Sequence, residues 1–491
     1  MMRSLYSGVS GLKNHQTRMD VVGNNISNVN TTGFKSSRVT FSDTLSQTLS
    51  GASAPTENRG GTNPKQIGLG SATSAIDTLF TDGSVQSTGV NTDLCLSGNG
   101  LFIVKDGDLS YYTRNGNFKF DKEGYYVNSD GLKVQGWSAT TPGDAINTNG
   151  QPSEICIPAG KTMAASATKV ATFSKNLDAA EPMIKEMSVT YTDGTTEKVK
   201  DGTTESVEVG KKFNAAGGTS TGATKTVASI TLKMTDGTTT TETSGAFKLN
   251  NSKPKTTIAT VYDSLGNAHN VTIYMTKTEV SSTTGNKWTI SLDPAGTGKQ
   301  TITESDGTTT TVDMTDLTLE FDLNGGLKTG GSGTATLTLT NGAGDNQSVH
   351  LTFDDVTQYA GSSTAFATTD GNAAGTLKSV SIDSAGVITG TYTNGLNVQE
   401  AQVAIAQFNN ASGLTKTGNS LYTESNNSGT PNIGTISDLG CTVTPSSLEM
   451  SNVDMASELT DMIVTQRGYQ SNSKIITVSD ELLETLINMK R

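Results

Sequence analysis

Both ends of this chain carry a seven-residue apolar repeat, and the sequence between them does not. Apolar side chains that recur about every 3.5 residues form a narrow stripe along a helix, and such a stripe packs against a partner helix. Residues 1–32 and 448–491 are therefore predicted to form a terminal coiled-coil helical domain. The residues that carry the stripe are Leu5, Val9, Leu12, Met19 and Ile26 in the first segment, and Met455, Leu459, Met462, Tyr469, Ile476 and Leu483 in the last.

The partner of each terminal helix can lie in the same chain or in another copy. An antiparallel pair that closes one globule is one alternative, because most amphipathic helices pack inside their own protein. Packing between subunits is the other, and we expect it here because polar members of the seam would leave either helix marginal in water by itself.

Local signals predict where the two helices begin and end. The first helix should stop among the asparagines at 24, 25, 28 and 30, ahead of Gly33, since Asn and Gly favour the helix C-terminus. The second should start from Ser451 or Asn452, with Asp454 in its first turn.

The middle of the chain is polar but weakly charged. Apolar residues make up 33% and charged residues 17% of the 491 residues, and Gly, Thr, Ser and Asn are abundant. Such a composition suits short strands joined by tight turns. The predicted fold class is therefore mainly β with α-helical termini, in which nested β-domains are inserted between N- and C-terminal coiled-coil helices.

Charge and hydropathy exclude several classes of function. The net charge of −12 opposes binding to a phosphate backbone, so no nucleic-acid partner is expected. No apolar run approaches the ~18 residues that would span a bilayer, and Leu5 to Leu12 is too broken by Ser and Gly to be the core of a cleaved signal peptide.

The residue types that carry chemistry are scattered. Three cysteines and three histidines occur without a CxxC or HExxH pattern, so we expect no metal site, no cofactor and no catalytic residue, and hence no enzyme. The Asp-Gly-Thr-Thr repeats at 193–196, 201–204, 236–239 and 306–309 are typical of turns between strands. Asn128-Ser129-Asp130-Gly131 is likewise predicted to be a hairpin turn and not a calcium loop.

Changes in composition divide the chain into nested parts. The terminal helical domain (1–32 and 448–491) encloses a connector (33–70 and 436–447). The connector encloses an inner β-domain (71–165 and 391–435). An outer insertion (166–390) forms one or two further β-domains.

Several long motifs resemble a known family. Residues 4–12 (Ser-Leu-Tyr-Ser-Gly-Val-Ser-Gly-Leu) and 24–35 resemble the N-terminal segment of bacterial flagellar rod and hook proteins, and residues 448–454 and 466–474 resemble the matching C-terminal segment. Thr260-Val261-Tyr262-Asp263-Ser264-Leu265-Gly266-Asn267 is similar to a motif in the inserted domain of the hook proteins. Because rod proteins lack a large insertion, the length also favours the hook branch.

The resemblance implies a function. The chain would be a structural subunit that assembles with copies of itself into the curved tube of the flagellar hook, a universal joint that transmits motor torque to the filament. Implied partners are the rod, the hook cap, the hook-filament junction proteins and the flagellar type III export apparatus, with no membrane insertion. Export without a cleaved signal peptide would place the subunit outside the cell, in the hook and basal body. Phe41 and Leu45 fit an export motif of early substrates.

Two alternatives stay open at this stage. A distal rod or other flagellar axial protein would share the terminal motifs and form straight tubes. A secreted β-rich adhesin would use its domains to bind a surface and would need no polymer.

Overall fold

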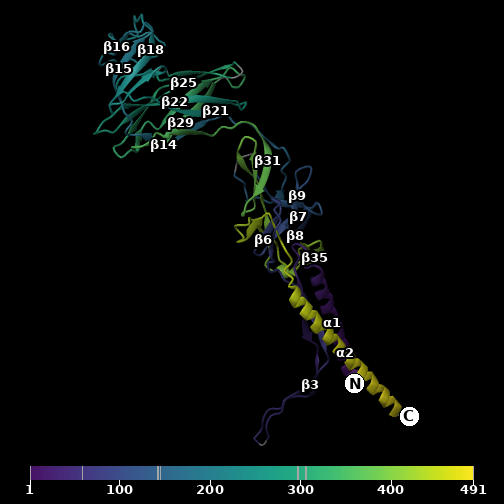
Figure 1. The fold of residues 1–491 in the computed structure, drawn as a ribbon. Coiled ribbons are helices and arrows are strands. Elements are labelled where there is room, and N and C mark those ends of the chain that lie inside the picture. The colour runs from purple at the N-terminus through teal and green to yellow at the C-terminus, as the bar shows by residue number, and fades with distance from the viewer. Residues whose placement is uncertain are drawn as a thin grey trace. The chain divides into compact units, whose positions relative to one another are not determined.

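The structure is a computed structural model that describes residues 2–57, 59–140, 143, 145–295, 298–304, 307–344 and 346–489. The chain forms two compact units. One unit runs to Lys161 and resumes at Thr376, and the other is Thr162–Gly375. The described residues form a mainly β structure with one α-helix near each end of the chain, as the fold class predicted (Figure 1).

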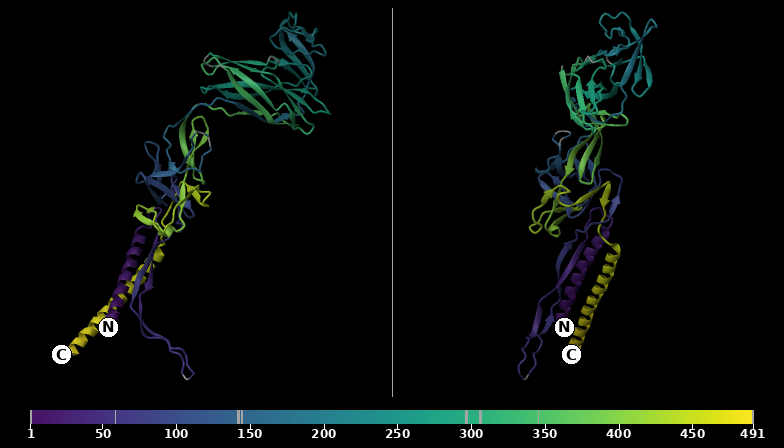
Figure 2. Two further views of the ribbon diagram at one scale, coloured as in Figure 1. Left: turned by 180° about the vertical axis from the view of Figure 1, so that it is seen from behind. Right: turned by 90° about the vertical axis from the view of Figure 1, so that its left-hand side faces the viewer.

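The two helices are α1 (Met2–Ser27) and α2 (Met455–Met489). They lie side by side in both views of Figure 2 and run antiparallel. The amide of Asn28 donates to the carbonyl of Asn24 where α1 ends, and Gly33 takes a positive φ of 66° a few residues on. The predicted position of Asp454 inside the first turn of α2 is wrong. Its Oδ1 accepts from the Ala456 amide at 3.0 Å, so Asp454 is the N-cap and the helix begins one residue later.

The segment 33–70, for which the sequence predicts an irregular connector, contains strands. β1 (Ser37–Asp43) pairs with β4 (Ser71–Thr78), and β2 (Ser46–Ser50) pairs with β3 (Lys65–Gly68). Every residue of β2 and β3 is exposed, so no side of this ribbon needs apolar side chains and no alternation marks it in the sequence. The β1–β4 pair contacts α1, because Asn14 Nδ2 donates to Ser71 Oγ at 2.7 Å.

The inner β-domain contains strands from both sides of the insertion. Its bounds differ from those predicted, since β4 pairs with β1 outside it, whereas strands before residue 391 and after residue 435 belong to it. Its main core includes Phe102, Phe118, Tyr126, Val403 and Ile405, all of which are fully buried. A 3-10 helix, η1 (Ala411–Gly413), lies between two of its strands. The strands are β5 (Val85–Ser87), β6 (Leu94–Ser97), β7 (Gly100–Asp106), β8 (Leu109–Thr113), β9 (Phe118–Phe120), β10 (Tyr126–Asn128), β11 (Lys133–Ser138), β12 (Ser153–Glu154), β31 (Gly375–Ile382), β32 (Val387–Tyr392), β33 (Asn397–Val403), β34 (Ile405–Gln407), β35 (Thr415–Gly418), β36 (Leu421–Thr423), β37 (Asn432–Gly434), β38 (Thr442–Pro445) and β39 (Ser447–Glu449).

The second unit contains two separate cores. Ile184, Val189, Ile230 and Leu232 belong to the core beneath the sheet β16-β15-β18-β19. The other core lies between a six-stranded sheet, β24-β25-β28-β29-β14-β30, and a five-stranded sheet, β21-β22-β23-β26-β27. The strands are β13 (Thr162–Met163), β14 (Val170–Asp178), β15 (Ile184–Tyr191), β16 (Thr196–Lys198), β17 (Val207–Glu208), β18 (Val227–Met234), β19 (Thr239–Glu242), β20 (Ala246–Phe247), β21 (Lys255–Tyr262), β22 (Ala268–Glu279), β23 (Lys287–Ser291), β24 (Lys299–Thr303), β25 (Thr309–Met314), β26 (Leu317–Phe321), β27 (Leu327–Thr329), β28 (Ser332–Thr338), β29 (Asn346–Tyr359) and β30 (Phe366–Thr369).

One turn with the pattern Asp/Asn-x-x-Gly recurs in both units. The side-chain oxygen of its first residue accepts from the amides two and four positions on, and its Gly has a positive φ. The predicted turn at 128–131 is of this kind: Asn128 Oδ1 accepts from Asp130 and Leu132 at 3.0 and 2.8 Å. These side-chain oxygens hold the backbone of the turn, as expected for a hairpin and not for an ion-binding loop. The same contacts occur at Asp121, Asp263, Asp322 and Asp383. The repeat at 306–309 begins outside the described residues.

Candidate assembly surface

Small residues line the contact between α1 and α2. A Cβ atom on Gly8 would lie 3.3 Å from Ile476 Cγ1, and one on Gly11 would lie 2.7 Å from Asn472 Nδ2. A Cβ atom on Gly468 would lie 2.6 Å from Cε1 of His15. The two helices therefore approach more closely than larger side chains at these positions would allow.

Polar pairs continue this contact toward the inner β-domain. Arg18 and Asp461 form an ion pair at 2.9 Å, and Asn25 Nδ2 donates to Glu458 Oε1 at 3.0 Å. Thr465 and Ser479 are the buried residues of α2. The contact within the chain thus uses Gly, Asn, His, Thr and Ser together with a few apolar side chains. The two helices are therefore paired in antiparallel orientation within one chain.

The predicted stripe residues fall into two groups. One group is half-buried in the chain: Leu5, Leu12, Met19, Ile26, Met462, Ile476 and Leu483. The other group is exposed: Val9 at 41%, Met455 at 45%, Leu459 at 46% and Tyr469 at 39%. Leu459 is predicted to lie in the helix contact, but its side chain is exposed. The row that faces α1 consists of Glu458, Thr465, Asn472 and Ser479, of which Thr465 and Ser479 are buried and the other two half-buried; all four are polar and so gave no apolar signal.

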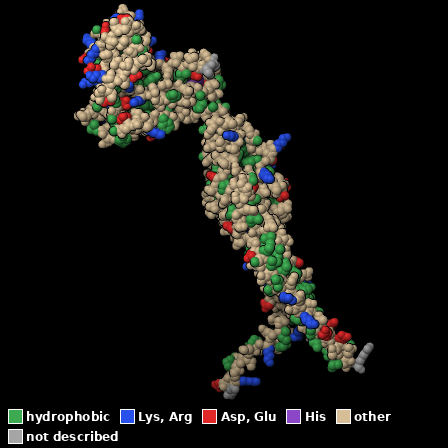
Figure 3. All heavy atoms as spheres, viewed as in Figure 1, with side chains coloured by type: hydrophobic (Ala, Val, Ile, Leu, Met, Phe, Trp, Pro, Cys, Tyr) green, Lys and Arg blue, Asp and Glu red, His purple; other side chains and the backbone are tan. Residues whose placement is uncertain are grey.

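A second apolar stripe on α2 was missed by the sequence prediction. It consists of Ile475, Val478, Leu482, Leu486 and Met489, which are 40–76% exposed, and we name it the outer stripe of α2. Its spacing of three and four residues places these side chains on one face of the helix. This spacing is visible in the sequence, but the heptad row beside it is equally apolar. Hydrophobic side chains are visible on the surface of the helical part in Figure 3.

The two candidate export residues are also at the surface. Phe41 lies on β1 and is 38% exposed, and Leu45 follows β1 and is 80% exposed. Neither side chain belongs to a core of the folded chain, so the fold does not account for their apolar character.

Other kinds of site gain no support from the described part of the chain. It contains no group of three or more His, Cys, Asp or Glu side chains that could hold a metal ion. None of its helices is both long and apolar enough to cross a membrane. Burial raises the pKa of the Cys95 thiol to about 11, which suits a packing role.

Four protein-family models match successive parts of the chain. Residues 5–35 match "Flagella basal body rod protein", and residues 95–172 match "Flagellar hook protein FlgE/F/G D1 domain". Residues 235–372 match "Flagellar basal body protein FlaE D2 domain", and residues 444–489 match "Flagellar basal body rod FlgEFG protein C-terminal".

Full-length relatives extend this similarity. The chain is 37% identical over 514 aligned residues to the flagellar hook protein FlgE of Borreliella burgdorferi and 38% identical over 529 to that of Treponema pallidum, with 100% of both chains covered in each case. It is 30% identical over 496 residues to the FlgE of Salmonella typhimurium, with 99% of this chain and 100% of the relative covered.

Proposed function

Since this chain belongs to the flagellar hook protein family, we propose that it is a structural subunit of the flagellar hook that assembles with copies of itself into a curved tube. In this role the tube is a universal joint that carries motor torque to the filament. The observation that supports self-assembly most directly is the outer stripe of α2, which is apolar and is left exposed after α1 and α2 have paired.

The stripe provides a driving force for polymerisation. Complete burial of a Leu, Ile or Val side chain contributes roughly 1.5–3 kcal/mol. The five stripe residues are 40–76% exposed, so burying the exposed part of each would contribute roughly 0.6–2.3 kcal/mol. Repeated in every subunit of a tube, these contributions offset the entropy lost when subunits are ordered.

Packing between subunits is therefore proposed for a different face of α2 from the one predicted by the heptad row. Met462, Ile476 and Leu483 belong to the side that approaches α1, whereas the outer stripe remains available to a neighbour. Val9, Leu459 and Tyr469 are exposed as well and extend the surface that we assign to neighbours.

The finer partners and the route to the outside are also proposals. A subunit of a hook would contact the rod at one end and the hook-filament junction proteins at the other, with the hook cap present during growth. Export through the flagellar type III apparatus, without a cleaved signal peptide, would use the segment around Phe41 and Leu45, whose exposure is compatible with recognition by that apparatus.

Electron microscopy of the purified chain tests the proposed function. We expect curved tubes. Straight rigid tubes would favour the distal-rod alternative. A protein that stays monomeric at high concentration would contradict self-assembly and leave the adhesin alternative.

A further inference from the structure

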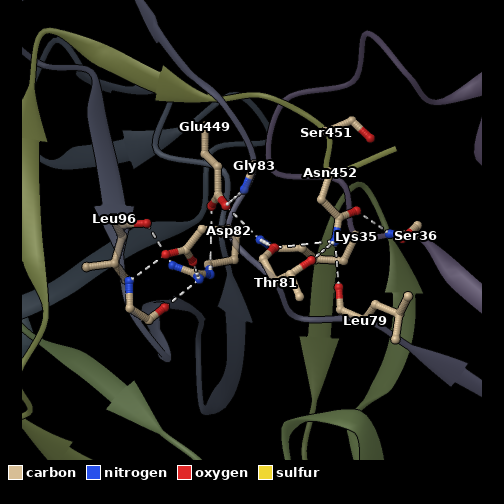
Figure 4. A network of polar contacts seen from close by, with 12 residues as sticks. Lys35, Ser36, Leu79, Thr81, Asp82, Gly83, Leu96, Glu449, Ser451 and Asn452 are labelled. Carbon is tan, nitrogen blue, oxygen red and sulfur yellow. Dashed lines mark hydrogen bonds and ion pairs between the residues drawn. The ribbon is translucent and has the colours of Figure 1, made fainter. Parts of the chain in front are cut away.

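Ionisable side chains are buried in both units. In the first unit, Lys35 and Arg114 lie beside the carboxylates of Glu449 and Asp82, so cations and carboxylates are paired there (Figure 4). In the second unit, His269 is only 1% exposed. Histidine is the side chain that ordinarily changes its charge near neutral pH. A buried histidine can therefore make the stability of its domain depend on pH.

The ring of His269 lies between two carboxylates. Its Nδ1 is 2.8 Å from Glu304 Oε1, and its Nε2 is 3.3 Å from Asp263 Oδ2. A neutral imidazole has one N–H donor and one bare nitrogen, and an ionised carboxylate can only accept. A neutral ring would therefore turn a lone pair toward one of the two carboxylates. Only the imidazolium, with a proton on each nitrogen, donates to both.

Hydrogen bonds hold Asp263 as an anion, although its side chain is fully buried. Its Oδ1 accepts from the amides of Leu265 and Asn267, each at 2.9 Å. Its Oδ2 accepts from Asn267 Nδ2 at 3.0 Å and from Asn341 Nδ2 at 2.6 Å. Burial alone would raise the pKa of this carboxyl, but these donors and His269 outweigh burial and hold the pKa well below its usual value. Because an anion faces Nε2 of the ring, Nε2 carries a proton.

Glu304 is the second carboxylate beside the ring. Its side chain is 24% exposed and so contacts water, in which carboxyl groups are ionised at neutral pH. The hydroxyl of Thr310 also lies near Nδ1, at 3.3 Å, but the carboxylate of Glu304 is closer. Nδ1 therefore carries a proton as well. Among the described residues, Asp263 and Glu304 are the titratable groups that contact the ring.

These contacts connect the two sheets of the sandwich in the second unit. Asp263 follows β21 and His269 lies in β22, and both strands belong to the five-stranded sheet. Glu304 follows β24 and Thr310 lies in β25, and both strands belong to the six-stranded sheet. The apolar core lies between these sheets. Loss of a proton from the ring would thus weaken a contact that holds the sheets together.

We propose that His269, Asp263 and Glu304, which we call the histidine bridge, bind a proton on folding and thereby make the second unit less stable in an alkaline medium. In the unfolded chain the ring is hydrated and loses its proton at about pH 6.5. The stabilisation by the bridge is complete below that pH, where the unfolded ring is protonated too, and it is lost as the pH rises. A difference of one bound proton changes the equilibrium constant of unfolding by about tenfold per pH unit.

The second unit also supplies a matched control. Residues 162–375 contain two histidines, His269 and His350, and no cysteine. His350 lies in β29 of the same sandwich and is exposed. His350→Gln therefore removes a histidine from this sandwich and leaves the histidine bridge intact.

Urea unfolding of the full-length chain between about pH 6.5 and 8.5 tests the bridge. Trp288 is fully buried in the core of the sandwich, and Trp137→Phe leaves it as the only tryptophan, so its fluorescence reports the second unit. In this background we expect the equilibrium constant of unfolding to rise with pH, by up to about tenfold per pH unit. His269→Gln does not titrate and should remove this dependence, whereas His350→Gln should keep it.

Nitrogen NMR of the histidine rings tests the same claim without a change in the bridge. The chain has three histidines, so the spectrum is simple. At about pH 7.5 an unperturbed histidine is mostly neutral. We expect the His269 ring to carry a proton on both nitrogens at this pH.

Two outcomes would overturn the proposal. One is a pH dependence of unfolding that is the same in His269→Gln as in the parent chain. The other is a His269 ring with one bare nitrogen at about pH 7.5, and this result decides the matter if His269→Gln does not fold. Neither measurement depends on whether the chain forms tubes, so failure of the histidine bridge and failure of the proposed function can be told apart.

Discussion

Substituting Gly468 by Ala should separate the packing of the helix pair from the stability of either helix. Ala is favoured over Gly in a helix interior by about 0.5–1 kcal/mol. At this position, however, the added Cβ would lie 2.6 Å from Cε1 and 2.7 Å from Nε2 of His15, so the helices must move apart or the ring must shift. Such overpacking typically costs about 1–3 kcal/mol. The two effects have opposite signs and act on different parts of the molecule.

Hydrogen exchange in α1 isolates the packing effect, because α1 does not contain the substitution. A cost of about 1–3 kcal/mol in pairing should speed exchange of the α1 amides roughly 5- to 150-fold. Gly23→Ala is the matched control: it lies in α1 with no atom within 4 Å of the added Cβ, so it should slow exchange there. Adding His15→Ala to Gly468→Ala should restore the slow hydrogen exchange of the α1 amides. If Gly468→Ala leaves α1 unchanged, or if His15→Ala gives no rescue, the assignment of the close helix contact is refuted.

Three more results are expected. Val478→Asp should abolish tube formation while leaving the monomer folded. The adjacent Thr477→Asp, which lies off the outer stripe, should still permit tubes. Sedimentation would distinguish the two variants, and equal behaviour would contradict a role of the outer stripe in assembly. The second unit should lose stability as the pH falls below about 4. Burial opposes ionisation of Asp263, but hydrogen bonds from neighbouring side chains outweigh it and hold the carboxyl pKa below its usual value. The stabilisation is therefore present above the pKa of the unfolded state and is lost on acidification. Asp263→Asn should reduce the loss of stability in an acid titration followed by Trp fluorescence, and an unchanged titration would contradict this. Replacing Phe41 and Leu45 by Ala should reduce the amount of subunit exported to the medium without changing its melting temperature. Normal export of this variant would refute the assignment of these residues as an export motif.

Some features of the fold could be predicted because they depend on local sequence. The seven-residue period identified the terminal helices, and the turn at 128–131 follows from Asn at its first and Gly at its fourth position. The composition predicted a β-rich middle for the same reason, since Thr and Gly determine strand and turn preferences residue by residue.

The helix contact could not be predicted by the same rules. A rule based on apolar periodicity predicts that the large apolar side chains of a helix form its contact with the neighbouring helix. In this chain, however, α1 and α2 approach each other at Gly8, Gly11 and Gly468. Several larger apolar residues of α2, those of the outer stripe, remain exposed. The heptad rule assumes one partner for a helix, and it fails where a helix has one partner in its own chain and, as we propose, others in neighbouring subunits.

Long-range polar contacts were also invisible in the sequence. Lys35 and Glu449 are 414 positions apart, and a pattern rule places both at the surface because charged residues are seldom buried. His269 is a similar case. No acidic residue stands at ligand spacing from it in the sequence, yet its ring lies between Glu304 at 2.8 Å and Asp263 at 3.3 Å. The fold, and not the spacing in the sequence, brings both carboxylates to it.

A helical reconstruction by cryo-electron microscopy of tubes assembled from the purified chain would show what covers the outer stripe of α2. We expect Val478 and Leu482 to be buried against a neighbouring subunit, while His15 still contacts Gly468 within each subunit. Tubes in which the outer stripe of α2 faces solvent, with contacts made by the β-domains alone, would contradict it.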